Sequence, residues 1–272
     1  MKRAFRQVFV LALALALSAS LAHAQGGPPL ITDDPDTPGP RYWEINVSAF
    51  VETNQLGRRI EAPRLDLNYG VGDQIQLKFE MPWVGVRPTG DSGQSGAGDA
   101  VLGVKWRFLG HEGTTLAWSV YPQFEFTTAH ASVTKGVVED GRRLLLPTEI
   151  TVEFAHIEVN GEVGRTLIEN VQTDWVYGIS TEGHVLHNLE MLAELHGQKT
   201  PGAATELIAN IGARQKLNHQ LTLMGAVGRA VHGDPDERPR VLVYVGLQFN
   251  LPGRYAFEEA RSVRLRCCRA RY

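Results

Sequence analysis

The chain has 272 residues, of which 43% are hydrophobic and 21% are charged. Residues 25 to 251 hold 18 Lys and Arg against 28 Asp and Glu, and so acidic a body argues against nucleic acid as a partner. The two cysteines, Cys267 and Cys268, are adjacent in a basic tail with six arginines, which excludes a disulfide framework for the body.

The first 24 residues have the features of a secretory signal peptide. Basic residues at positions 2, 3 and 6 precede an apolar run from Val8 to Leu17, and Ala22-His23-Ala24 forms a cleavage site. That run is shorter than the roughly 18 apolar residues that a transmembrane helix needs, and no later run is longer. Residues 25–40 are rich in Pro, Gly and Asp, so we expect an irregular periplasmic lead-in there.

From Arg41 onward, alternating runs of about ten residues are separated by connections. The pattern is clearest from Ile60 to Trp83, where Gly70-Val71-Gly72-Asp73 joins two alternating arms as a hairpin turn would. In each arm, apolar side chains occupy one face and polar or charged side chains the other. The predicted strands are 41–52, 60–70, 74–85, 98–108, 114–126, 143–154, 156–165, 173–182, 188–197, 204–216, 220–230 and 240–250.

Long and short connections alternate along these twelve strands. The long ones include Val84 to Ala97, Thr127 to Arg142 and Val231 to Pro239, and short turns separate them. A membrane barrel with an even number of strands has such an alternation, whereas a soluble sandwich gives no reason for it. The sequence therefore predicts an all-β fold, an antiparallel up-and-down transmembrane β-barrel of about 12 strands in residues 41–250, placed in the outer membrane. A basic C-terminal tail, 251–272, follows it.

In this geometry the apolar faces contact lipid and the charged faces line the lumen. Aromatic residues at the strand ends are expected near the membrane interfaces; they are Trp43, Trp83, Trp106, Trp118, Trp175 and Phe249. The candidate lumen-facing binding residues are Lys78, Lys105, Arg107, Glu149, Glu153, Glu158, Glu162, Glu190, Glu194 and Arg214. They permit two interpretations: an acidic wall that steers polar or cationic solutes, or a paired network that fills a narrow barrel.

Two motifs invite a metal or nucleotide interpretation. His184 and His187, with Glu182 and Glu190 nearby, have a spacing that suits a metal site on a helix, but this segment is predicted to be a solvated turn. The sequence from Gly70 to Gly72 lacks the third glycine of a nucleotide-binding loop and precedes a strand. No cofactor or metal is predicted.

His130 and Ser132 suggest a hydrolase, in which a histidine activates a neighbouring serine. They lie in a loop-like stretch without a clear orienting partner. We therefore predict that the chain is not an enzyme and keep an outer-membrane hydrolase as the weakest alternative.

The stretch from Pro28 to Val47, P-P-L-I-T-D-D-P-D-T-P-G-P-R-Y-W-E-I-N-V, resembles the start of the exported bacterial barrel family labelled MetA-pathway of phenol degradation. Further similar stretches are Tyr69 to Asp73, Gly98 to Phe108, Leu144 to Pro147 and Ile211 to Gly228. The resemblance extends from about residue 28 to 250. It implies an outer-membrane barrel linked to the uptake of aromatic or other small compounds, and it implies no catalytic residues.

These observations predict a passive channel or transporter for small molecules, aromatic ones among them, in contact with outer-membrane lipid. Its mouth would be shaped by Val84 to Ala97 and by Thr127 to Arg142. The main alternative is a plugged barrel with a structural or surface-binding role.

Overall fold

The computed structural model describes residues 27–111, 114–154, 157–169 and 173–253. The predicted signal peptide and nearly all of the basic tail, with both cysteines, lie outside the described residues. Within them, no helix is long and apolar enough to cross a membrane.

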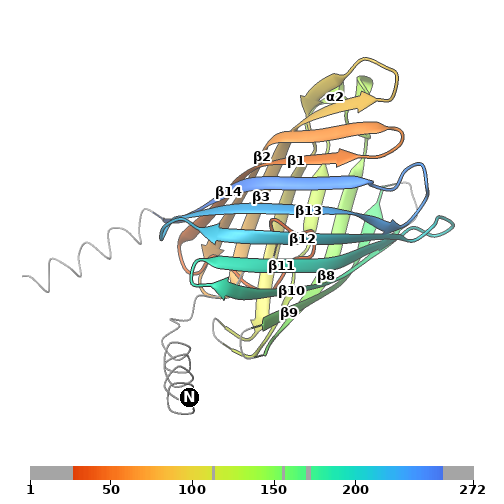
Figure 1. Ribbon diagram of the computed structural model, residues 1–272. Coiled ribbons are helices and arrows are strands. Elements are labelled where there is room, and N and C mark those ends of the chain that lie inside the picture. Colours follow the sequence, from red (N-terminus) through yellow and green to blue (C-terminus); the bar gives the residue numbers. More distant parts are fainter. Residues whose placement is uncertain (1–26, 112–113, 155–156, 170–172, 254–272) are drawn as a thin grey trace, which may run out of the picture.

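The described residues form antiparallel strands and one short helix (Figure 1). Their bounds are β1 (Tyr42–Thr53), β2 (Gly57–Val71), β3 (Ile75–Pro88), β4 (Gln94–Ala97), β5 (Ala100–Leu109), β6 (Leu116–Val120), β7 (Gln123–Phe126), α2 (His130–Thr134), β8 (Arg142–Phe154), β9 (Ile157–Ile168), β10 (Asp174–Leu186), β11 (Leu189–Lys199), β12 (Glu206–Lys216), β13 (Leu221–His232) and β14 (Val241–Pro252).

Twelve barrel strands result because two of them are interrupted. β4 and β5 pair with successive parts of β3, and β6 and β7 both pair with β5 on one side and β8 on the other. Tyr42 to Thr53 pair along their whole length with Val241 to Pro252, so β14 closes the sheet onto β1. Closure leaves no exposed sheet edge, which is the condition for a sheet to exist in lipid. The predicted 12-stranded antiparallel barrel is confirmed.

The two faces of the wall have the polarity of a membrane protein. In β5, Trp106 is 51% exposed on the outside, whereas its neighbour Lys105 is only 2% exposed on the inside. The same alternation of outer apolar and inner polar residues runs through the other strands. The five tryptophans are all exposed on the outer face, and Phe249 is half-buried there. Such a surface is stable in a bilayer and would be poorly soluble in water.

One predicted boundary needs correction, and one loop, whose predicted bounds agree with the structure to within one residue, has an unexpected position. Most of the predicted loop Val84 to Ala97 is strand, because the pairing of β2 with β3 continues as far as Gly57 and Pro88, and only residues 89–93 form the turn. The connection 127–141 folds back into the barrel. Its Val137 and Val138 pack against Val84 on the inner face of β3, and Arg59 donates a hydrogen bond to the Val137 carbonyl at 3.1 Å.

The predicted periplasmic position of the lead-in is also wrong for its described part. Residues 27–40, here called the plug segment, lie inside the barrel and contact β5, β9, β10, β11 and β12. The segment has no regular secondary structure, as predicted. It lies inside because the inward-facing charges of the wall bind its backbone and its aspartates, as described below.

Candidate functional site in the barrel lumen

Asp33 and Asp34 shape the plug segment locally. The Asp33 Oδ1 atom accepts a hydrogen bond from the Asp34 N–H at 2.9 Å, and the Asp34 Oδ1 atom accepts one from the Asp36 N–H at 2.7 Å. Carboxylates that bind nearby backbone N–H groups in this way stabilise turns without a helix or strand. The T-D-D-P-D sequence therefore bends inside the lumen and directs its charges toward the wall.

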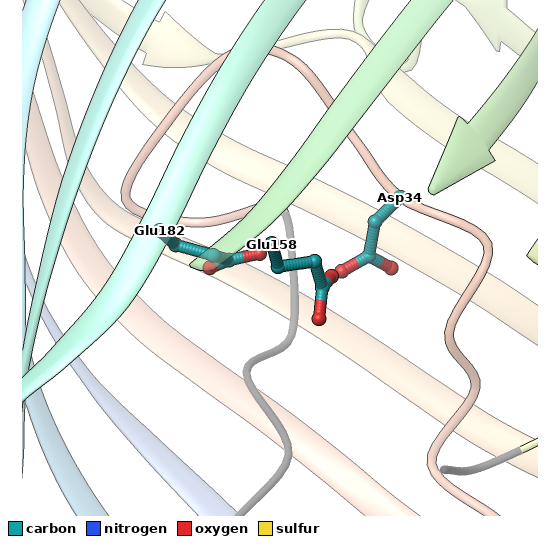
Figure 2. A group of neighbouring side chains, drawn as sticks. All are labelled: Asp34, Glu158 and Glu182. Atoms are coloured by element: carbon teal, nitrogen blue, oxygen red, sulfur yellow. The ribbon is translucent and has the colours of Figure 1, made fainter. Parts of the chain in front are cut away.

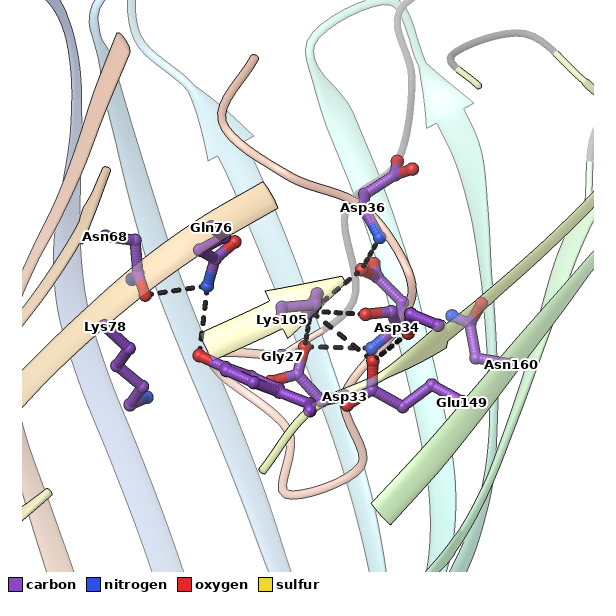
Figure 3. A network of polar contacts seen from close by, with 12 residues as sticks. Gly27, Asp33, Asp34, Asp36, Asn68, Gln76, Lys78, Lys105, Glu149 and Asn160 are labelled. Atoms are coloured by element: carbon purple, nitrogen blue, oxygen red, sulfur yellow. Dashed lines mark hydrogen bonds and ion pairs between the residues drawn. The ribbon is translucent and has the colours of Figure 1, made fainter. Parts of the chain in front are cut away.

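Two cations of β5, Lys105 and Arg107, bind the aspartates of the plug segment, and Figure 3 shows the contacts of Lys105. The Lys105 Nζ atom lies 2.9 Å from Asp33 Oδ1, donates to the Asp34 carbonyl, and lies 4.6 Å from the centre of the Tyr121 ring. Arg107 makes an ion pair of 2.7 Å with Asp36. Both cations are buried, so they depend on these partners to offset the cost of leaving water.

Wall carboxylates bind the backbone of the same segment. Glu194 of β11 accepts hydrogen bonds from the N–H groups of Ile31, at 3.0 and 3.1 Å, and of Thr32, at 2.8 Å. Glu162 of β9 accepts one from the Asp33 N–H at 3.1 Å. These bonds satisfy backbone donors that would otherwise be buried without a partner.

Arg214 of β12 completes the attachment. Its Nε and Nη2 atoms donate to the Pro28 carbonyl at 3.1 and 3.0 Å. Its Nη1 atom forms ion pairs with Glu182 at 2.6 Å and Glu190 at 3.2 Å. One guanidinium thus connects the beginning of the plug segment to β10 and β11.

Two glycines of the wall allow the segment to approach closely. A Cβ atom on Gly178 of β10 would lie 2.2 Å from Thr32 Oγ1, and one on Gly70 of β2 would lie 1.7 Å from the Gly39 carbonyl oxygen. A side chain at either position would displace the plug segment, because these separations are far below van der Waals contact. The packing is therefore specific.

All ten predicted lumen residues lie on the inner face. Those that contact the plug segment are Lys105, Arg107, Glu162, Glu194 and Arg214.

The other predicted lumen residues contact the wall. Glu149 lies 3.7 Å from Lys105 and accepts a hydrogen bond from Ser119, and Glu190 pairs with Arg214. Lys78 pairs with Asp66 and Glu80 at 3.2 and 2.9 Å. Glu153 and Glu158 face the lumen and are half-buried. Solute binding by the ten residues remains a prediction.

Several residues of this network were not among the lumen residues predicted from the sequence. Asp33, Asp34 and Asp36 were assigned to a periplasmic segment, and Glu182, the last residue of the predicted strand 173–182, was grouped with a solvated turn. β10 in fact continues to Leu186, and Glu182 is in phase with the inward-facing Asp174 and Ser180. Applying the alternation from Asp174 to the end of the predicted strand would have found it.

The metal and hydrolase hypotheses gain no support. His184 lies 3.7 Å from Glu190, but Glu182 and Glu190 are buried and engaged by Arg214 rather than solvated in a turn. His130 is exposed, whereas Ser132 is buried against Gly96. A serine nucleophile needs an open approach for its substrate, which the buried Ser132 lacks.

The two neighbouring aspartates of the plug segment have opposite pKa shifts. Burial raises the pKa of Asp34 well above its ordinary value; Lys105 opposes this effect, whereas Asp36 and Asp33 add to it. Burial also raises the pKa of Asp33, but the nearby charges of Lys105 and Lys78 outweigh it, so the pKa of Asp33 is lowered. Asp33 is thus the permanent anion of the pair, and Asp34 is the one that favours a proton.

A cavity of about 430 Å³ lies between the plug segment and the wall. Its lining includes apolar or aromatic side chains, Phe50, Val176, Leu242 and Tyr244, and charged ones, Arg64, Asp66, Lys78 and Glu80. Its volume is in the range of small-molecule sites. A second cavity, next to Lys105 and Asp34, measures only about 20 Å³, enough for about one water molecule.

Comparisons with known proteins support this architecture. No protein-family model matches the chain, and no curated protein matches it. Among solved structures, the COG4313 outer membrane channel from Pseudomonas putida F1 is similar with a TM-score of 0.68 at 11% identity, covering 84% of this chain and 100% of that one. The KdgM porin (TM-score 0.54, 10% identity) and the NanC porin (0.54, 8%) each cover 76% of this chain, and 99% and 100% of their own. At such identities the likeness shows the fold, that of an outer-membrane β-barrel.

Proposed function

We propose that this protein is a passive outer-membrane channel for small molecules. The observation that carries the proposal is the cavity of about 430 Å³ inside a closed wall whose outer surface is apolar. A space of this size within a membrane-spanning barrel offers a small solute a place to reside between the two sides of the membrane. The proposal assigns no catalytic step to the chain.

The lining indicates the class of solute. Phe50 and Leu242 pack with Ile208 and Ala230 into an apolar surface on the inner face. Among the charged residues of the same lining, Arg64 pairs with Glu80 at 2.6 Å. We infer a solute with an aromatic or aliphatic body and a polar group, in agreement with what the resemblance to the MetA-pathway family implies.

The attachment of the plug segment favours a second candidate, a plugged barrel with a structural or surface-binding role. The segment is bound by Lys105, Arg107, Glu162, Glu194 and Arg214, and it occupies the lumen beside the cavity. In a channel, the same segment would leave a narrow path and give a low conductance.

Single-channel recording in a planar lipid bilayer separates the two candidates. We expect small, discrete conductance steps from the full mature chain, refolded and inserted. A silent barrel, shown to be inserted by its resistance to protease, would contradict the channel and favour the plugged barrel.

Flux of solutes into liposomes tests the solute class. We expect benzoate, which has an aromatic body and one charge, to enter faster than gluconate, which has a polar body and one charge. Leu242→Gln should reduce this preference because it places an amide among the apolar side chains of the cavity lining. Equal entry of both solutes would contradict the solute class and leave the channel intact.

A further inference from the structure

Three carboxylates from different elements converge in the lumen (Figure 2). Asp34 belongs to the plug segment, Glu158 to β9 and Glu182 to β10, and one oxygen of each lies within 4.8 Å of the other two. Glu158 and Glu182 are direct register partners on neighbouring strands. Because their like charges repel, this arrangement needs a compensating positive charge or proton.

The Asp34 carboxylate provides an independent indication of a ligand. Asp34 is 2% exposed, and its Oδ1 atom accepts the hydrogen bond from the Asp36 N–H. The Oδ2 atom is buried without a hydrogen-bond partner. Figure 2 shows the Asp34 carboxylate turned toward that of Glu158. A buried carboxylate oxygen without a partner is costly, so an additional group at this position is expected to bind it.

The nearest cation supplies that group only in part, because the Lys105 Nζ atom lies 3.8 Å from Asp34 Oδ1, not beside the unpartnered Oδ2 atom, while it binds Asp33 at 2.9 Å. In the described part of this network, the carboxylates are Asp33, Asp34, Asp36, Glu149, Glu158, Glu162, Glu182, Glu190 and Glu194, and the cations are Lys105, Arg107 and Arg214. Each cation already has a close acidic partner: Asp33 for Lys105, Asp36 for Arg107, and Glu182 with Glu190 for Arg214. An excess of negative charge therefore remains around Asp34 and Glu158.

We propose that Asp34, Glu158 and Glu182 bind a calcium ion that links the plug segment to β9 and β10. Ca²⁺ prefers oxygen ligands at about 2.3–2.6 Å, so ligands on opposite sides of the ion lie about 5 Å apart, which accommodates the observed separations. Water completes the coordination. With three carboxylate residues as ligands, we expect a dissociation constant on the order of 10⁻⁴–10⁻³ M, as in extracellular calcium modules.

The ion would stabilise the docked position of the plug segment. Asp34 is the ligand on the plug segment, whereas both other ligands belong to the wall. Binding of Ca²⁺ to the docked arrangement stabilises it by mass action. This inference is independent of the proposed transport, because it is tested by metal binding and not by flux.

Isothermal titration of the full mature chain with Ca²⁺ in detergent, up to about 5 mM so that the expected range is covered, tests the site. We expect one saturable site in the wild type and an affinity at least ten-fold weaker in Glu158→Gln and in Asp34→Asn. The matched control is Glu206→Gln, which removes an inward-facing carboxylate of β12 outside the cluster. It should bind as the wild type does. The circular dichroism of each variant must match that of the wild type.

Three results would overturn the proposal. They are a wild type without saturable Ca²⁺ binding, a folded Glu158→Gln protein with unchanged affinity, and an equal loss of affinity in Glu206→Gln. The last result would mean that the general negative charge of the lumen, rather than these three carboxylates, attracts the ion.

Discussion

Two parts of the barrel wall use their inward charges differently. In β2 and β3, the charges pair with one another: Arg64 with Glu80 at 2.6 Å and Lys78 with Asp66 at 3.2 Å. In β5 and β9 to β12, the charges reach across the lumen to the plug segment, as Lys105, Arg107 and Glu194 do. Both parts border the larger cavity, β2 and β3 with four charged residues and β9 to β12 with Glu162, Val176, His196 and Asn210, but the second part also binds the plug segment.

The registers of the strands explain this difference. Between β2 and β3, Asp66 lies opposite Glu80, Asn68 opposite Lys78 and Arg64 opposite Pro82, so each of the two acids has a cation diagonally across. Between β8 and β10, the facing pairs are Glu149 with Glu162, and Glu158 with both Glu153 and Glu182. Like charges cannot satisfy each other, so these strands need partners from outside the wall. The plug segment supplies one such partner, the Asp33 N–H group bound by Glu162, and it supplies the N–H groups of Ile31 and Thr32 to Glu194 of the next strand, β11.

Lys105→Met should have the largest effect, because Lys105 holds together Asp33, Glu149 and the Asp34 carbonyl. Removing one partner of a buried ion pair typically costs about 3–5 kcal/mol. We expect a loss of this size in urea unfolding of the folded protein in lipid vesicles, together with a higher conductance. Lys216→Met, at an exposed position near the end of β12, is the control and should change neither. Unchanged stability in Lys105→Met would contradict the role assigned to the β5 cations.

Gly178→Ala should displace the plug segment without any change of charge. The new methyl group would overlap Thr32, and overpacking typically costs about 1–3 kcal/mol. Faster proteolysis near residue 32 and a higher conductance are expected. The control is Gly161→Ala. Gly161 lies on the neighbouring strand β9, opposite Ile179 of β10, and its new Cβ atom would meet only Ile150 Cγ2, at 3.4 Å, so this variant should behave as the wild type does. Identical behaviour of the two variants would argue against a closely docked segment.

Arg64→Gln tests the other part of the wall. Its side chain is about one third exposed, so we expect a loss of stability below about 1 kcal/mol. The loss of a cation beside the cavity should make the channel more selective for cations, as measured by the reversal potential in a salt gradient. The plug segment should stay docked, with proteolysis near residue 32 unchanged. Release of the segment by this substitution would show that the two parts of the wall do not act separately.

The smallest expected effect is a dependence on pH through Asp34. Because docking raises the pKa of Asp34, the docked segment binds a proton more tightly than the undocked one. The docking of the plug segment is therefore most stable at a pH near the ordinary pKa of aspartate. It becomes less stable as the pH rises from there toward the raised pKa of docked Asp34. Asp33 has a lowered pKa, so it stays ionised above about pH 5 and does not contribute to the pH dependence of docking there.

Without calcium, conductance should therefore increase from pH 5 to pH 7. Asp34→Asn should have a smaller slope than the wild type. Since Glu158 and Glu182 face Asp34, added Ca²⁺ should also reduce the slope by binding all three carboxylates. Equal slopes in the wild type and Asp34→Asn would contradict the role of Asp34.

The number of strands, and the face of the sheet on which each side chain lies, followed from patterns within short stretches of the sequence. A period of two is visible in the sequence, and burial in lipid requires a closed sheet, so twelve alternating runs were enough to predict a twelve-stranded barrel. For the same reason the ten candidate lumen residues lie on the inner face, whereas their binding of a solute stays a prediction. The boundary at Glu182 failed because the glycine and histidines that follow it resemble a turn, whereas pairing with β11 continues to Leu186 and Leu189.

The sequence by itself thus determined the topology of the wall and the polarity of its two faces. Only the tertiary structure decided where residues 27–40 lie, because Pro, Gly and Asp are equally compatible with a loop in water and a bent segment in a polar lumen. Their position depends on contacts with residues 70 to 190 positions away, such as Lys105, Glu194 and Arg214. No local pattern contains such contacts; they exist only when the closed barrel brings unpaired charges together around the segment.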